Sequence, residues 1–436
     1  MSLRILGMLA AGTLAALASS AAQAATEVDF WHAFSPDIKL GKVLTRYVEE
    51  FNASQDDYKV VLTYKGTYDD TVNATIAAYR AGKQPAIVQV QANAAPTLIF
   101  SSAIKPVDDV MAEAGIEVDW SRYLEPVMAM YRYKGKQMAM PFNTSTPLMW
   151  YNADAFQKAG IDKIPATWTE LEAAARRLKA AGYPCPVTSA WQEWVLLKNY
   201  AFVQDLPLAT EGNGMDGPDA RLVFNHNGVV EQLARIGRWS KEGLFEYQGR
   251  QWTGAHQAFY AERCAVLLES SAGYGGISQN AKFKFGAAVL PVEEGTKTPR
   301  NTFIGGAGLF VMKGLDKAVY DGAAAFFKFL SAPELQFDWH RNSGYVPITV
   351  DAYELARKQG YYEKFPHQEL AIKELLRQPS ENTRGIRLGY LVQIDEILNE
   401  EMEKIWSQEK SAQQAADDMV RRADPLLARF AKTVAD

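Results

Sequence analysis

The sequence predicts an α/β protein of two lobes, in which mixed sheets are flanked by helices and short strands cross between the lobes. Strand-like and helix-like segments alternate along the chain, which is typical of sheets with helices on their faces. The chain has 436 residues, enough for two or three domains. No long flexible linker separates the alternating units. We therefore expect lobes joined by short crossovers.

The first 24 residues have the features of a secretory signal peptide. Arg4 gives a positive start, residues 5–18 are mostly apolar, and Ala22-Gln23-Ala24 is a small-residue cleavage site. A single transmembrane anchor is the alternative, but the apolar stretch is shorter than the ~20 residues that a span needs. We expect residues 1–24 to be removed near Ala24 and the mature protein to be exported.

The N-terminal part of the mature chain alternates between strand and helix. We expect strands over 27–31, 58–63 and 86–90, and helices over 35–51 and 69–82. Ser35-Pro36 is typical of a helix N-terminus, and apolar residues between Leu40 and Phe51 repeat with the period of one helix face. The alternation favours a mostly parallel sheet in this part of the chain.

The rest of the chain repeats this pattern. Further strands are expected over 148–151, 265–268, 285–290 and 309–312. Thr167 and Glu170 form a capping box at the start of a helix that ends at Gly182. Amphipathic helices dominate from about residue 368, and their acidic stretch around Glu400-Glu401 and Gln408-Glu409-Lys410 is expected on a solvated surface.

Three polar or glycine-rich bends are candidate crossovers between the lobes: Asn143-Thr144-Ser145-Thr146, Gly305-Gly306-Ala307-Gly308 and Gly344-Tyr345-Val346-Pro347. They predict a first lobe of residues 25–143 plus 304–346 and a second lobe of residues 144–303 plus 347–436. A ligand site is expected between the lobes, because strand ends and helix N-termini meet there.

Composition argues against several classes of protein. The 46 Lys and Arg residues against 51 Asp and Glu give a net charge of −5, whereas a nucleic-acid binder would show a basic surplus. The five histidines are scattered, so we expect no metal site. Cys185 and Cys264 are an even pair in an exported chain. The sequence allows either a disulfide between them or two free thiols. We find no pair of carboxylates that would suit a glycoside hydrolase.

Several motifs resemble the extracellular solute-binding proteins of ABC importers. They are residues 151–156, Ala159-Gly160, 165–171, 323–330, Pro333-Glu334, Trp339 and 344–348. A narrower resemblance, to the glycerol-3-phosphate-binding periplasmic members of that family, covers nearly the whole mature chain. It rests on Phe30-Trp31-His32, residues 63–68, 105–107, 141–147, 191–194, 304–307 and Arg387-Leu388-Gly389. The resemblance implies a two-lobed periplasmic-binding-protein fold of type II, with hinge crossovers, in the periplasm.

The resemblance also implies a set of ligand contacts. The positions that match hydroxyl or backbone contacts to the ligand are Tyr68, Ser145, Ser270, Gly306 and Tyr345, and those that match the two tryptophans covering the glycerol are Trp191 and Trp194. Two positions depart from the family pattern. Ala92 stands where a glutamate holds the glycerol hydroxyls, and Asp395 stands where an arginine lies near the phosphate.

Each of these residues also has a plain structural interpretation. Ser270 could simply cap a helix, Ser145 could bond its own backbone in a turn, and the tryptophans and tyrosines could pack in the core. If the segment is helical, Trp191 and Trp194 share one face. Arg387 could offer phosphate a cation or form a structural ion pair. Asp395 could face a cationic ligand group, such as choline, or solvent.

The expected function is capture and transport. The resemblance implies a monomeric binding protein without catalysis or cofactor, which closes on sn-glycerol 3-phosphate or a glycerophosphodiester such as glycerophosphocholine. It would then deliver this small phosphorylated polyol to the permease subunits of an ABC importer in the inner membrane. A neutral-sugar or oligosaccharide binder on the same scaffold is the alternative, with a secreted glycoside hydrolase as a remote one.

Overall fold

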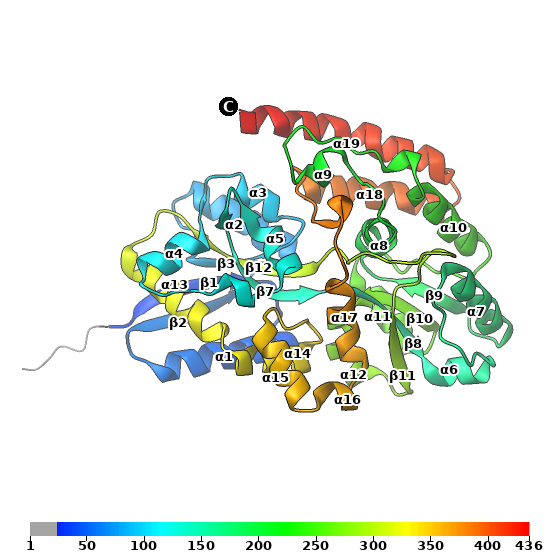
Figure 1. The fold of residues 1–436 in the computed structure, drawn as a ribbon, viewed down its shortest axis with the longest axis horizontal. Helices are drawn as coiled ribbons and strands as arrows, with labels where there is room; N and C mark the ends of the chain where they lie inside the picture. Colours follow the sequence, from blue (N-terminus) through cyan, green and yellow to red (C-terminus); the bar gives the residue numbers. More distant parts are fainter. Residues whose placement is uncertain (1–23, 436) are drawn as a thin grey trace, which may run out of the picture.

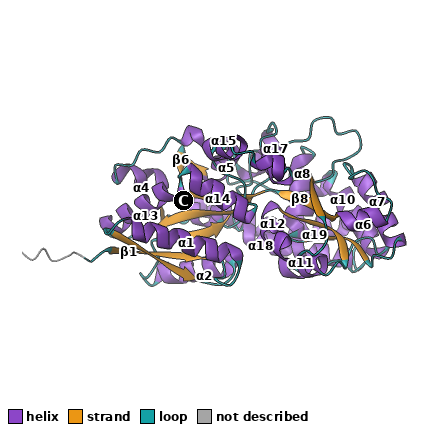
Figure 2. Ribbon diagram, turned by 90° about the horizontal axis from the view of Figure 1, so that it is seen from below, coloured by secondary structure: helices purple, strands orange, loops and turns teal. Residues whose placement is uncertain are grey.

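The computed structural model describes residues 24–435, so the expected signal peptide lies outside the described residues except for Ala24. Figure 1 shows two lobes, each built around its own sheet, with the last helix running across the top of both. In each lobe, helices lie on both sides of the strands (Figure 2). This confirms the two-lobed α/β prediction, while the residues at which the lobes divide stay a prediction.

The sheet of the first lobe contains both parallel and antiparallel pairs. Its strands are β1 (Thr26–His32), β2 (Tyr58–Tyr64), β3 (Ile87–Gln91), β4 (Ile104–Lys105), β7 (Met140–Ser145) and β12 (Gly305–Met312). The order is β2-β1-β3-β12-β4, with β7 also paired to β12. The β1 strand is parallel to β2 and β3, but β12 is antiparallel to β3, β4 and β7. The three N-terminal strands are thus parallel, as expected, but the sheet as a whole is mixed because β12 enters it from the other lobe.

The sheet of the second lobe is also mixed. Its strands are β8 (Pro147–Asn152), β9 (Cys185–Ser189), β10 (Cys264–Ser270) and β11 (Phe285–Val289), in the order β11-β8-β10-β9. Strand β8 is antiparallel to both neighbours, and β9 is parallel to β10. A two-stranded hairpin, β5 (Arg132–Tyr133) with β6 (Lys136–Gln137), lies outside both sheets.

The helices of the first part of the chain follow the apolar periodicity of the sequence. They are α1 (Lys39–Ser54), α2 (Tyr68–Arg80), α3 (Ala95–Ile99), α4 (Val107–Glu113) and α5 (Glu125–Tyr131), joined later in the chain by α13 (Lys317–Leu330), α14 (Pro333–Ser343), α15 (Val350–Lys358) and α16 (Tyr361–Lys364). The predicted start of α1 at Ser35-Pro36 was wrong. Ser35 instead folds a turn over Gly41, and its hydroxyl oxygen accepts from the Asp37 amide at 3.3 Å.

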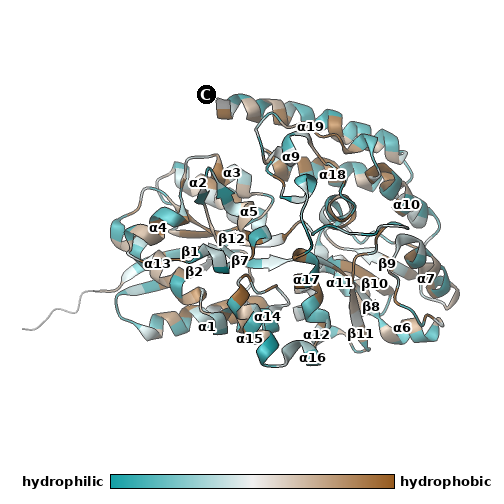
Figure 3. Cartoon of the chain, in the orientation of Figure 1, coloured by the Kyte–Doolittle hydropathy of each residue, from teal (hydrophilic) through white to brown (hydrophobic). Residues whose placement is uncertain are grey.

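The helices of the second lobe include the predicted capping box. They are α6 (Ala153–Lys158), α7 (Trp168–Ala180), α8 (Asn199–Val203), α9 (Thr210–Gly214), α10 (Val229–Lys241), α11 (Trp252–Tyr260), α12 (Tyr274–Asn280), α17 (His367–Leu375), α18 (Leu391–Trp406) and α19 (Ala412–Ala435). The hydroxyl of Thr167 accepts from the Glu170 amide at the start of α7. Helix α19 is striped with hydrophilic and hydrophobic residues in Figure 3, as expected of an amphipathic helix.

The two lobes meet where the chain crosses between the sheets. Only Thr146 separates β7 of the first sheet from β8 of the second, so residues 143–146 are extended chain rather than a bend. The Val346 amide donates to the Thr144 carbonyl at 2.8 Å and places a second crossing segment beside the first. Gly305-Gly306-Ala307-Gly308, predicted as a bend, is the start of β12 and carries an irregular register opposite β7.

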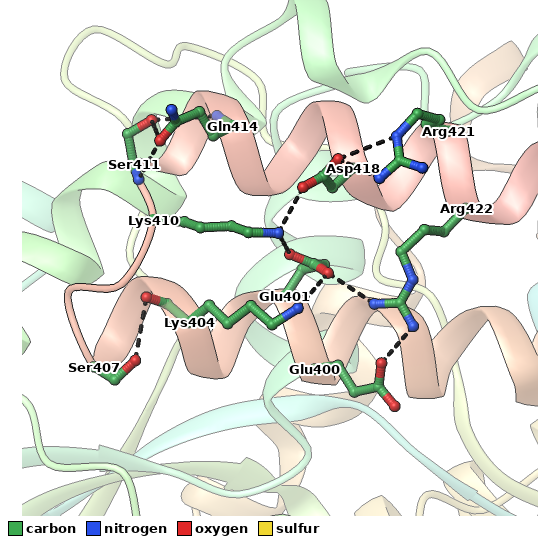
Figure 4. A network of polar contacts seen from close by, with 10 residues as sticks. All are labelled: Glu400, Glu401, Lys404, Ser407, Lys410, Ser411, Gln414, Asp418, Arg421 and Arg422. Atoms are coloured by element: carbon green, nitrogen blue, oxygen red, sulfur yellow. Dashed lines mark hydrogen bonds and ion pairs between the residues drawn. The ribbon is translucent and has the colours of Figure 1, made fainter.

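The acidic stretch near residue 400 is not a simple solvated surface. Figure 4 shows Glu401 between α18 and α19, facing Lys404, Lys410 and Arg422 at 2.6–2.8 Å. The Glu401 side chain is 1% exposed. The solvated-surface prediction was wrong for this residue, because the loop after α18 and the helix α19 fold back and bring Lys410 and Arg422 onto a carboxylate that Lys404 of its own helix already pairs with.

The last helix also reaches the first lobe. The Phe430 ring of α19 packs edge-on against Phe100, which follows α3, with ring centroids 4.8 Å apart. Phe100 in turn contacts Tyr133 at 5.0 Å. The C-terminal segment therefore packs on both lobes.

The two cysteines form a disulfide inside the second lobe. Cys185 and Cys264 are directly opposite each other in the parallel pair β9 and β10, and both are buried. Of the two alternatives left open by the sequence, the structure has the bonded one. Within residues 24–435, no helix combines the length and apolarity needed to cross a bilayer. Over the same range, no group of three or more His, Cys, Asp or Glu side chains is placed to hold a metal ion.

Candidate functional site

The Tyr68 hydroxyl lies at the crossover, within a buried group of polar side chains. Tyr68 is the first residue of α2, directly after the capping residue Thr67. Its hydroxyl accepts from the Nδ2 of Asn143 at 3.0 Å, and the Tyr345 hydroxyl lies beside it. Burial raises the pKa of Tyr68 and of Tyr345. Both hydroxyls therefore stay protonated at neutral pH and can serve a ligand as neutral donors.

Gly306 lies directly over Asn143 and leaves no room for a side chain. Its φ is 90°, which favours glycine, and a Cβ at this position would overlap the Asn143 carbonyl oxygen. Its own carbonyl accepts from the Ala92 amide at 3.0 Å, which joins the end of β3 to the start of β12. Ala92 itself is buried. The glycine thus holds the backbone of the site close to Asn143 and Tyr68.

Replacing Gly306 with alanine is expected to disturb this corner. The new methyl group would have to push the Asn143 carbonyl away, at a positive φ that L-residues avoid. We expect a loss of ~2 kcal/mol or more in unfolding free energy, measured by urea denaturation. Gly295→Ala is a matched control, since its φ is 82° and a Cβ there would meet nothing within 4 Å. Equal losses in the two variants would show that the Asn143 contact has no effect.

Ser145 and Trp194 meet on the other side of the crossing. A Cβ on Gly305 would lie 2.8 Å from the Cζ2 of Trp194 and 2.9 Å from the Oγ of Ser145. The Trp194 indole donates to the Phe303 carbonyl at 3.1 Å, so its N–H is already used. Trp194 can offer a ligand only its ring surface, which is the role that a polyol-covering tryptophan has.

Trp191 does not lie on a helix with Trp194. Its φ is 49°, and residues Glu193–Lys198 form a π-helical segment that begins after it. The Trp191 carbonyl accepts from the amides of Trp194 and Val195, both at 2.9 Å. The two tryptophans therefore do not share one face of an α-helix. Trp191 is half-buried and stays next to Trp194.

Ser270 lies at the end of β10, next to the crossing strand. Its hydroxyl oxygen accepts from the Ala272 amide at 3.1 Å and caps the short turn of residues 271–273 before α12. The next residue, Ser271, donates its amide to the Thr146 carbonyl at 2.8 Å, which joins this turn to the crossover. The plain interpretation of Ser270 as a cap is confirmed. Its hydroxyl proton remains available for a ligand.

A buried carboxylate accepts a hydrogen bond from the backbone amide of Ser270. The Oε1 of Glu269 accepts from the Ser270 amide at 2.6 Å, and its Oε2 lies 2.9 Å from the Nε2 of His256. Glu269 and His256 are both buried. The sequence did not reveal this pair. His256 is on α11 and Glu269 is on β10, 13 positions away, and no sequence motif has that spacing.

Asp395 is paired inside the protein instead of facing solvent. Its Oδ1 accepts from the Nζ of Lys198 at 2.5 Å, and its Oδ2 accepts from the Nδ2 of Asn93 at 3.0 Å. The Lys198 and Asp395 side chains are 4% and 7% exposed. Of the two alternatives that the sequence left open for Asp395, the solvent one was wrong. Lys198 cancels its charge, and Asn93 connects it to the first lobe.

Arg387 binds the backbone of the first lobe. One of its terminal nitrogens donates to the carbonyls of Ala129 and Arg132, the latter at 2.6 Å, and its guanidinium lies over the Tyr133 ring. Burial lowers the pKa of Arg387. These contacts make it a link between the segment before α18 and the first lobe, rather than part of the group around Tyr68. The expected structural ion pair is replaced by bonds to backbone carbonyls.

Most of the expected contact residues therefore gather in one place. The crossing region brings together Tyr68, Ser145, Trp194, Ser270, Gly306 and Tyr345. It also places Asn143 and, further along, Asn93 and Lys198 beside them, which sequence reasoning did not identify. Lys198 directly precedes α8 and is 197 residues from Asp395, so no spacing in the sequence could have indicated the pair.

A family model described as bacterial extracellular solute-binding protein matches residues 46–366. Several relatives, from Escherichia coli and Shigella flexneri, carry the name sn-glycerol-3-phosphate-binding periplasmic protein UgpB. The one from Escherichia coli (strain K12) is 43% identical over 418 residues, which cover 94% of this chain and 95% of the relative. The one from Shigella flexneri is 42% identical with the same coverage.

Solved structures of binding proteins share the fold at low sequence identity. UgpB from Mycobacterium tuberculosis, in complex with glycerophosphocholine, has a TM-score of 0.79 and 21% identity, covering 93% of this chain and 99% of that one. The GacH receptor of Streptomyces glaucescens has a TM-score of 0.78 and 19% identity, covering 94% and 100%. The two lobes, the crossover region between them and the match over 321 of 436 residues agree with one another. This chain belongs to the bacterial extracellular solute-binding protein family.

Proposed function

We propose that this protein is the periplasmic binding component of an ABC importer and captures sn-glycerol 3-phosphate or a glycerophosphodiester. The observation that carries the proposal is the group of hydroxyl and amide donors at the crossover, in a chain 43% identical to relatives named for binding sn-glycerol 3-phosphate. Tyr68, Tyr345, Ser145 and Ser270 supply hydroxyls there. Trp194 supplies a flat apolar face of the kind that suits a glycerol backbone.

The charge balance of the site bears on which phosphate fits. Lys198 pairs with Asp395, so Asp395 does not repel an anion as a lone carboxylate would. The carboxyl group of Glu193 lies near both, and burial raises its pKa to about 6, so the group as a whole carries no excess positive charge. The same pairing leaves no uncompensated cation on Lys198. Phosphate would therefore be held mainly by neutral donors, which suits the single charge of a diester better than the nearly double charge of a monoester. We propose glycerophosphodiesters as the preferred ligands.

The protein would act by binding alone. A ligand enclosed at the crossover is shielded from water, and this shielding strengthens each hydrogen bond to its phosphate oxygens. The loaded protein would then dock on the permease subunits and release the ligand there. The group of residues around Tyr68 consists of hydroxyls and amides, which suit the binding of a ligand's oxygens.

Calorimetric titration with glycerol 3-phosphate, glycerophosphocholine and maltose tests the proposal. We expect both phosphates to bind, glycerophosphocholine more tightly. At 100 times the dissociation constant, each should add about 2.7 kcal/mol to the free energy of unfolding. Ser270→Ala should weaken phosphate binding, and it should also lower the free energy of unfolding of the empty protein by about 1 kcal/mol, because the Ala272 amide loses its cap. Binding of maltose alone would contradict the proposal and favour a sugar binder.

A further inference from the structure

A line of three hydrogen bonds, of which the middle one is fully buried, runs through the first lobe to the Tyr68 hydroxyl. The Ala33 amide, after β1, donates to the Oε1 of Gln89 at 2.9 Å. The Nε2 of Gln89, on β3, donates to the Oδ1 of Asn143 at 2.9 Å. The Nδ2 of Asn143, on β7, then donates to the Tyr68 hydroxyl oxygen at 3.0 Å. Gln89 and Asn143 are both fully buried.

The direction of this line is set by its first member. A backbone amide can only donate, so the oxygen of Gln89 has to face Ala33 and its nitrogen has to face Asn143. The oxygen of Asn143 must then face Gln89, and its nitrogen must face Tyr68. The Tyr68 oxygen therefore receives a hydrogen bond from Asn143. Its own proton is left to donate. The Tyr345 hydroxyl beside it is one acceptor for this proton, and a ligand oxygen is the other, with Tyr345 then turning to donate to the ligand as well.

This direction decides what Tyr68 can recognise. A hydroxyl that already accepts from Asn143 is best satisfied by donating to an oxygen acceptor. Phosphate oxygens accept and never donate as long as they are ionised, whereas a sugar hydroxyl can do either. A fixed donor at this position therefore favours an anionic oxygen, through a charge-assisted hydrogen bond.

We propose that Gln89 and Asn143 are positioning residues, which commit the Tyr68 proton to a phosphate oxygen of the ligand. The inference rests on the proposed function, since it assumes a phosphorylated ligand beside Tyr68. Gly306 contributes by having no side chain over Asn143, whose Nδ2 would lie 3.2 Å from a Cβ there. Two buried amides in the sheet of the lobe then act on ligand selection through a third residue.

The test is a double-mutant cycle between Gln89→Met and Tyr68→Phe. Loss of the Gln89 amide frees Asn143 to turn its oxygen toward Tyr68 and take the proton that the ligand would receive. We expect Gln89→Met to weaken binding of glycerophosphocholine by about 10-fold or more, because hydrogen bonds to charged groups are the strong class. In the Tyr68→Phe background, which has no hydroxyl to orient, the same change should alter the dissociation constant less than twofold.

Gln137→Met is the matched control, because Gln137 is a buried glutamine of β6 that donates to the Ala139 carbonyl, away from this line. It should leave the affinity unchanged. An equal effect of Gln89→Met with and without the Tyr68 hydroxyl, or an effect no larger than that of Gln137→Met, would overturn the inference.

A second variant keeps the test decisive if Gln89→Met does not fold. Asn143→Asp retains the acceptor for Gln89 but replaces the donor to Tyr68 with an oxygen. It should weaken binding in the wild-type background more than in the Tyr68→Phe background, and equal losses would contradict the inference. A wild-type protein that binds neither glycerol phosphate contradicts the proposed function itself. Wild-type binding with an additive cycle contradicts only the role of Gln89 and Asn143.

Discussion

Replacing Cys185 and Cys264 together with alanine is expected to lower the free energy of unfolding by about 4 kcal/mol. The bond joins residues 79 positions apart, and closing a loop of that length restricts the unfolded chain strongly. Both residues are also buried, at the start of the paired strands β9 and β10. The measurement is urea denaturation of both proteins without reductant.

Denaturation of the wild-type protein with a strong reductant present serves as the control for this experiment. Reduction should move its midpoint toward that of the double-alanine variant, because both then unfold to a chain without the cross-link. A variant with the wild-type midpoint under oxidising conditions would show that the bond does not stabilise this lobe.

Lys198→Met is expected to cost about 3–5 kcal/mol, because it leaves the Asp395 carboxylate buried without its cation. Changing both partners, as Lys198→Met with Asp395→Leu, should recover much of that loss, since an apolar pair has no charge to desolvate. Asn93 would still lose its acceptor in the double variant. Chemical denaturation of the three proteins gives the comparison.

Lys59→Met provides the surface counterpart of this change. Lys59 pairs with Glu27 at 3.3 Å, and the two side chains are 57% and 67% exposed. Its replacement should change the stability by no more than about 0.5 kcal/mol. If Lys198→Met were as harmless as Lys59→Met, the buried pair would not contribute to stability as its burial implies.

Elements with strong local patterns could be predicted from the sequence, and their relative directions could not. The strand over 86–90 and the helix capped by Thr167 are each specified by neighbouring residues. The antiparallel entry of β12 depends on pairing with β3 and β7, which are more than 150 residues away in the chain. The prediction of where α1 begins was wrong for a similar reason. The Ser35 turn packs on Gly41, and this contact outweighs the preference of Ser-Pro for a helix N-terminus.

The candidate site was predicted through resemblance, and its charge balance was not. Tyr68, Ser145, Ser270, Gly306 and Tyr345 were each identified by a motif, and the fold brings them to one crossover. Lys198 has no such motif, because its partner lies on a distant helix.

Gln89 did leave a signal in the sequence. It is a polar residue within Ile87-Val88-Gln89-Val90, a strand expected to be buried. A buried amide costs free energy unless both of its polar groups are paired. Such a residue therefore indicates a polar partner nearby, but its position in the strand does not say which partner.

The contacts of the C-terminal segment with the first lobe have a thermodynamic consequence. Phe430 on Phe100, Arg387 on two carbonyls and Asp395 with Asn93 are made entirely by the protein's own groups. Any separation of the lobes has to break these contacts. They therefore raise the population of the conformation in which the lobes are together before a ligand binds. The apparent affinity scales with that population. Residues far from the ligand, such as Phe430, would thus affect its apparent affinity. They would also affect the free energy that the permease must supply to separate the lobes and release the ligand.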